Sequence, residues 1–148
     1  MLEHLDGLYR EVILDHFKNS THHGELPQAQ IKSEGANPLC GDEITFYVQL
    51  DKDRISQVRF QGKGCAISQA AASMLSGELE GKTVAQAGQL IDALKTLMQG
   101  QTLPTAVDLG ELEALAGVRK FPVRVKCAAL SWNVVEQGLK QRGSDGSH

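Results

Sequence analysis

Polar and apolar side chains alternate one by one over residues 43–50, with Ile44, Phe46, Val48 and Leu50 as the apolar positions. A period of two predicts a strand with one buried face. Residues 51–53 make a polar turn, and residues 55–61 resemble a returning strand, so we expect an antiparallel hairpin over residues 43–61. A short edge strand is expected near Ile31–Glu34.

Elsewhere the apolar residues recur at steps of three and four, which predicts helices. In the first of these the residues that form one apolar face are Leu5, Leu8, Tyr9, Val12, Ile13 and Phe17. The expected helices cover residues 3–18, 66–79 and 84–99, and a last helix runs from Pro122 to about Arg142. Thr83 and Gln86 fit a capping box at the start of the third of these helices. Residues 112–116 are expected to add one or two helical turns.

This order of elements favours an α+β fold, a small antiparallel sheet of two or three strands with helices packed on one face. The 148 residues suit one domain, which we expect over residues 1–142, followed by a disordered tail over residues 143–148.

The composition excludes several classes of protein. A net charge of -3 does not indicate the excess of basic residues that is typical of nucleic-acid-binding proteins. No apolar run approaches the length of a membrane span. The N-terminus lacks the unbroken apolar run of a secretory signal, so we expect a cytoplasmic protein. Its three cysteines, odd in number and widely spaced, argue against a disulfide framework.

The cysteines and one aspartate form a candidate metal site. Cys40 and Asp42 flank Gly41 and can face one point in an extended segment. Cys65 opens a helix, whose N-terminus favours the thiolate, and Cys127 lies within the last helix. Three thiolates and a carboxylate suit four-coordinate zinc. The spacing alone is a weak signal, and it leaves buried or incidental thiols as the alternative interpretation.

Four motifs narrow the choice. They are LYREVILDHFKN over residues 8–19, NPLCGD over 37–42, GKGCAIS over 62–68 and FPVRVKCA over 121–128. In this order they resemble the SufU/IscU (NifU N-terminal-like) family of iron–sulfur cluster assembly proteins. Lys126 stands where IscU proteins carry histidine, and residues 77–120 are long enough for the extra helix of SufU. The segment 121–125 also departs from the Leu-Pro-Pro-Val-Lys motif that IscU offers its cochaperones.

The resemblance to SufU implies a zinc-dependent sulfurtransferase that works with a SufS-type cysteine desulfurase and delivers sulfur to the downstream Suf assembly machinery. It implies zinc ligands at Cys40, Asp42, Cys65 and Cys127, with Cys40 as the sulfur acceptor. In the family, a histidine of the desulfurase replaces the acceptor cysteine on zinc. Detachment would leave Cys40 a deprotonated nucleophile.

Three thiolates, one carboxylate and Zn²⁺ sum to a net negative charge, so the site needs a cationic neighbour. Arg124 lies one helical turn before Cys127, and we assign it to charge compensation or to holding Cys40.

The main alternative to a sulfurtransferase is a scaffold protein on which a [2Fe–2S] cluster is assembled through the same ligands. A zinc hydrolase is disfavoured because four protein ligands leave no place for water. A structural zinc module stays open.

Overall fold

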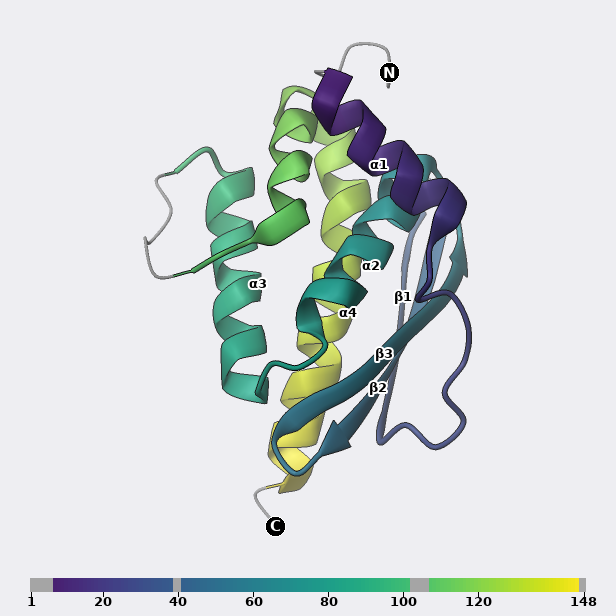
Figure 1. Ribbon diagram of the computed structural model, residues 1–148, viewed down its shortest axis with the longest axis vertical. Helices are drawn as coiled ribbons and strands as arrows, with labels where there is room; N and C mark the ends of the chain where they lie inside the picture. The colour runs from purple at the N-terminus through teal and green to yellow at the C-terminus, as the bar shows by residue number, and fades with distance from the viewer. Residues whose placement is uncertain (1–6, 39–40, 102–106, 147–148) are drawn as a thin grey trace.

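The computed structural model describes residues 7–38, 41–101 and 107–146. It has two layers, a three-stranded sheet on one side and a group of helices on the other (Figure 1). This arrangement confirms the predicted α+β class with helices packed on one face of a small antiparallel sheet. Within the described residues, no helix is long and apolar enough to cross a membrane.

The sheet consists of β1 (Ile31–Asn37), β2 (Asp42–Asp51) and β3 (Arg54–Lys63), antiparallel and in that order. The predicted one-sided burial of β2 is confirmed, because Ile44, Phe46 and Val48 are buried against the helices. The pairing of Glu43 with Lys63 brings the start of β2 beside the end of β3. This register sets up the candidate site at one end of the sheet.

The helices are α1 (Gly7–Asn19), α2 (Ala66–Leu79), α3 (Val84–Met98) and α4 (Pro122–Gly146), with an 11-residue 3-10 segment, η2 (Gly110–Lys120), between α3 and α4. The Thr83–Gln86 capping box is present at α3. The segment expected as one or two turns is longer, and α4 extends past Arg142, since no proline ends it there. The division of the chain at residue 142 stays a prediction.

The central helix α2 is packed on several sides, by α1, α4, η2 and β3. Most of its residues are buried, and many are alanine or serine, which lets its neighbours approach closely.

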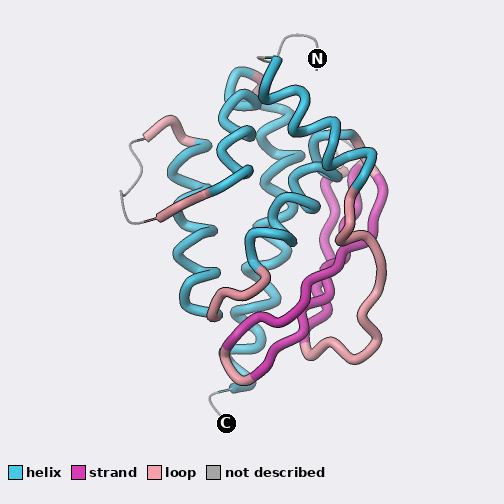
Figure 2. Tube along the Cα trace, viewed as in Figure 1, coloured by secondary structure: helices cyan, strands magenta, loops and turns pink. Residues whose placement is uncertain are grey.

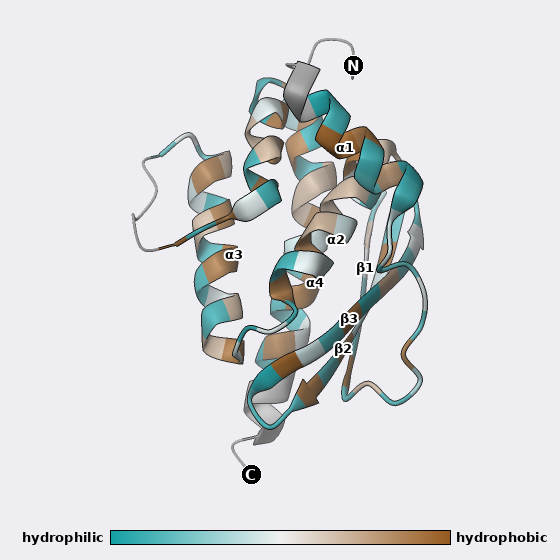
Figure 3. Cartoon of the chain, viewed as in Figure 1, coloured by the Kyte–Doolittle hydropathy of each residue, from teal (hydrophilic) through white to brown (hydrophobic). Residues whose placement is uncertain are grey.

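The described side chains of α1, on the outside of the molecule, are less buried than those of α2. Ile13 is fully buried, whereas Phe17, expected on the same apolar face, is 45% exposed. Figure 3 shows hydrophobic and hydrophilic residues mixed along the visible side of α1.

Glycines allow α4 to lie very close to β1. A Cβ on Gly35 would meet Val134 Cγ2 at 2.5 Å, and a Cβ on Gly138 would meet Ile31 Cγ2 at 2.8 Å. Ser33 adds a hydrogen bond from its hydroxyl to the Val134 carbonyl. The β1 strand and the long C-terminal helix therefore form one closely packed unit.

The outer edge of β3 is covered by its neighbours in the chain. The N–H groups of Ile55 and Phe60 donate to the carbonyls of Lys82 and His22. Val58 N–H donates to the Glu80 carboxylate at 3.0 Å. Figure 2 shows the turn between α2 and α3 reaching the sheet, as these bonds require. A strand edge that would otherwise present unpaired backbone groups is thus satisfied within the chain.

Candidate metal centre

Three side chains from distant parts of the chain converge at the end of the sheet near the start of β2. They are Asp42 at the start of β2, Cys65 just before α2, and Cys127 in the first turns of α4. One ligand atom from each lies within 4.8 Å of the others. No other metal-ligating group of three or more was found among the described residues. Cys40, the fourth predicted ligand, lies outside the described residues.

Asp42 is almost completely buried, at 1% exposed. Its Oδ1 accepts a hydrogen bond from the Cys65 backbone N–H at 2.8 Å, and its Oδ2 lies 3.9 Å from Cys65 Sγ. A buried carboxylate needs such partners, because desolvation without them is costly. One oxygen is thus used to hold the start of α2, and the other faces the sulfur.

Gly64 makes this contact possible. Its φ is +147°, and a Cβ there would lie 2.0 Å from Asp42 Oδ1. Any other residue at this position would collide with the carboxylate and strain the backbone. In the sequence, Gly64 is noted only as part of the GKGCAIS motif over residues 62–68. The steric requirement at Gly64 is a feature of the site that the sequence reasoning missed.

The two cysteines of the described site differ in exposure. Cys65 occupies the N-cap position of α2 and is half-buried, whereas Cys127 is completely buried. Neither forms a disulfide. Cys127 Sγ lies 3.6 Å from the Val123 carbonyl and 4.0 Å from an Arg124 guanidinium nitrogen. The helix N-terminus lies at Cys65, and the guanidinium lies beside Cys127.

Arg124 is a cation beside the described sulfurs. Its hydrogen bond with Cys127 raises the pKa of Arg124 above its usual value; burial opposes this effect, and the charges of Cys65 and Cys127 add to it. Lys126, by contrast, is exposed. The one-turn spacing from Cys127 therefore places Arg124, and not Lys126, at the site.

The histidines of the first motif and the loop after it take part in other contacts. His16 lies 2.8 Å from Ser73 Oγ and 3.0 Å from Glu111 Oε2 through its two ring nitrogens. His22 Nε2 lies 2.8 Å from Glu80 Oε1. These contacts connect α1 and the following loop to α2 and the residue that ends it.

The donor set can be compared with the needs of zinc. In a tetrahedral site with Zn–S near 2.3 Å and Zn–O near 2.0 Å, ligand atoms lie roughly 3.3–3.8 Å apart. The Asp42–Cys65 separation of 3.9 Å is close to this, and the 4.8 Å limit on the whole group requires only small movements. Two thiols and one carboxylate therefore fit a metal that accepts sulfur and oxygen.

Comparison with known proteins identifies the family. The model of the NifU-like N-terminal domain matches residues 8–128. The chain therefore belongs to the SufU/IscU-type family of iron–sulfur cluster assembly proteins.

Two curated relatives cover almost the whole chain. The zinc-dependent sulfurtransferase SufU of Bacillus subtilis is 43% identical over 95% of this chain and 96% of its own. The scaffold protein IscU of Streptococcus pyogenes is 41% identical over 99% of this chain and 91% of its own. Among solved structures, a protein described as a SUF-system scaffold, from Fervidobacterium islandicum, has a TM-score of 0.83 and 37% identity, covering 87% of this chain and 94% of its own.

Proposed function

We propose that the chain holds one zinc ion through Cys40, Asp42, Cys65 and Cys127, and that Cys40 accepts sulfur from a SufS-type cysteine desulfurase for iron–sulfur cluster assembly. The observation that carries this proposal is the convergence of Asp42, Cys65 and Cys127 from three distant segments. The similarity to a zinc-dependent sulfurtransferase supports the choice of ion.

Cys40 completes the set by its place in the chain. It precedes Asp42 by two residues, in the connection between β1 and β2. Two residues of chain span at most about 7 Å, so Cys40 is within reach of the three converging side chains. Cys65 and Cys127 are fixed to helices, and a ligand from a connection is the easier one to exchange.

The chemistry proposed for Cys40 is a thiol–disulfide type exchange. Bound zinc would keep the cysteines deprotonated at neutral pH. The Cys40 thiolate attacks the outer sulfur of the persulfide on the desulfurase. A sulfur–sulfur bond forms on Cys40 as the bond to the desulfurase cysteine breaks, and that cysteine leaves as a thiolate. Arg124, beside Cys127, is positioned to balance the negative charge of the site.

The test combines metal analysis with peptide mapping. Freshly purified protein should contain about one zinc per chain, and incubation with a cysteine desulfurase and cysteine should place a persulfide on Cys40, detected by mass spectrometry. Cys40→Ser should abolish this transfer, while Cys65→Ser is the matched control, losing zinc affinity but keeping the Cys40 thiol. Persulfide found mainly on Cys65 or Cys127 would overturn the assignment.

The alternative is a scaffold that assembles a [2Fe–2S] cluster through the same residues. The similarity to the IscU scaffold protein of Streptococcus pyogenes favours it, and thiolates are the usual ligands of such clusters. Lys126 removes one ligand candidate, because it carries no free donor pair when charged. Anaerobic purification followed by iron, sulfide and zinc analysis separates the two functions. Delivery to the Suf machinery and a cytoplasmic location stay predictions.

A further inference from the structure

The two edges of the sheet differ in how their backbone groups are satisfied. Residues 54–60 of β3 exchange hydrogen bonds with the loop after α1 and the turn after α2. For residues 31–36 of β1, by contrast, no backbone hydrogen bond connects the strand to a described segment other than β2. An uncovered strand edge is a template for another strand.

The charges on β1 are complementary to those of a second copy of the same strand. Lys32 and Glu34 have side chains 59% and 65% exposed, and Lys32 Nζ lies 3.6 Å from Glu34 Oε1. If a second β1 lies antiparallel with Ser33 opposite Ser33, each Lys32 faces Glu34 of the other copy. Opposite charges directly across a ladder stabilise the pairing.

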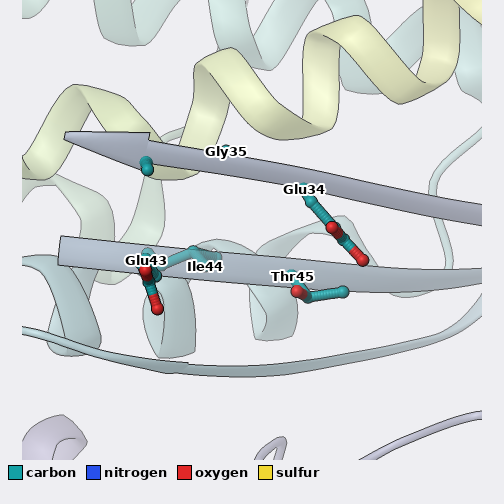
Figure 4. A pocket seen from close by; sticks show the side chains of 6 residues that line it. Glu34, Gly35, Glu43, Ile44 and Thr45 are labelled. Carbon is teal, nitrogen blue, oxygen red and sulfur yellow. The ribbon is translucent and has the colours of Figure 1, made fainter. Parts of the chain in front are cut away.

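This register is favoured over its neighbours. Sliding the strands by two residues in one direction places Glu34 opposite Glu34, and sliding them in the other places Lys32 opposite Lys32. Like charges directly opposite destabilise a ladder, so both alternatives are disfavoured. Figure 4 shows the Glu34 side chain directed from β1 toward β2, on the side away from the helix that runs alongside β1, and the side chain is 65% exposed.

The helix beneath β1 presents a second self-complementary surface. Val134 and Gly138 face β1, and Val135 is buried on the interior side. At 100° per residue, Asn133 and Gln137 therefore lie on the opposite flank of α4, next to the open edge, and both are exposed. Each carboxamide both donates and accepts, so these two positions can hydrogen-bond to the same positions of a second copy.

We propose that the chain forms a homodimer through the open edge of β1, which joins two sheets into one six-stranded antiparallel sheet with the α4 helices side by side. The two-fold axis passes at Ser33, and the same surface is used by both copies. The metal centres lie beyond opposite ends of the paired strands, so the dimer leaves both accessible. The inference does not depend on the identity of the metal.

The dimer should be weak and dependent on concentration. A single strand pair with a narrow helix flank is smaller than the roughly 1,200–2,000 Å² of a standard stable interface. Sedimentation velocity over a dilution series of the full chain should show exchange between one copy of 16.0 kDa and twice that mass.

Charge reversal tests the register. Lys32→Glu places a carboxylate opposite Glu34 of the other copy on both sides of the axis and should raise the dimer dissociation constant roughly tenfold or more. The double variant K32E/E34K restores opposite charges across the axis and should restore the dimer. Lys63→Glu is the matched control, because Lys63 is exposed and lies 3.6 Å from Glu43, yet is far from this edge. Metal content is measured for each variant.

The outcomes are distinct. Recovery of the dimer in the double variant supports the proposal, because the monomeric fold gains no new contact from exchanging the two charges. A protein that stays monomeric at its highest soluble concentration overturns it. So does a dimer that Lys32→Glu leaves unchanged, or one that Lys63→Glu weakens equally.

Discussion

Substitution of Gly64 by alanine should damage the metal centre without touching a metal ligand. The new Cβ would lie 2.0 Å from Asp42 Oδ1, so the carboxylate must move by about 1 Å or more to reach an ordinary contact. That movement breaks the 2.8 Å hydrogen bond from the Cys65 N–H. Loss of a buried, charge-assisted hydrogen bond costs about 1.5–3 kcal/mol of unfolding free energy.

Gly24 supplies the control. Its φ of +144° nearly equals the +147° of Gly64, but a Cβ there would have no neighbour within 4 Å. Both alanine variants therefore carry the backbone strain, about 1–3 kcal/mol each. Only Gly64→Ala carries the collision, so it should be less stable than Gly24→Ala by the additional ~1.5–3 kcal/mol.

Two measurements check this difference. Urea denaturation of the metal-free proteins gives the unfolding free energies, and competition with a chromogenic chelator gives zinc affinity, which should fall about tenfold or more in Gly64→Ala alone. Equal stability and equal zinc affinity of the two variants would refute the role of Gly64. A larger loss for Gly24→Ala would refute the comparison of strain.

Three further predictions concern side chains around the site and the sheet edge. Asp42→Ala should destabilise even the metal-free protein by about 1–3 kcal/mol by leaving the Cys65 N–H unpaired, and Asp42→Asn should recover most of this, as urea denaturation would show; equal losses would contradict it. Arg124→Ala should slow persulfide transfer roughly tenfold or more, while Lys126→Ala leaves the rate unchanged; equal rates would remove Arg124 from the site. Burial raises the pKa of Glu80, but the Val58 N–H, His22 and Arg59 outweigh it and lower the pKa below 4.5. Its contribution is therefore present above about pH 4.5 and lost as the pH falls through the lowered value, so the stability difference from Glu80→Gln should shrink in acid; a constant difference across pH would contradict this.

Local patterns predicted most of the secondary structure. The strict alternation in β2 specifies a strand because only one face is buried, and the Thr83–Gln86 pair specifies a helix start through its own hydrogen bonds. The 3-10 segment was less predictable. Its buried residues Leu112, Leu115 and Val118 recur every third residue, and that spacing also suits a short α-helix.

The site was predictable in its residue types but not in its contacts. Cys65, Asp42 and Cys127 stand out because thiolates and a carboxylate suit zinc and because each lies in one of the four motifs. The bond from the Cys65 N–H to Asp42, and the space left by Gly64, depend on the β2–β3 register. The turn and the alternation set the register of this hairpin, but the Asp42 contact also depends on where α2 begins after β3, which no local pattern reports.

The exposure of Phe17 has a similar origin. The three-and-four spacing placed it with Ile13 on one apolar face, yet α1 contacts mainly α2 and η2, a surface too narrow to cover the whole face. A hydrophobic period gives the direction of an apolar face, whereas the width that is buried depends on the partner elements.

The burial of α2 bears on how the protein opens under thermal motion. Amide hydrogens in its middle, around Ala71 and Met74, should exchange with solvent only on global unfolding, because neighbours pack α2 on several sides. Amides of α1, which has few fully buried residues, should exchange through local opening. Cys65 directly precedes α2, so its sulfur should keep its position while outer parts of the molecule open and close locally.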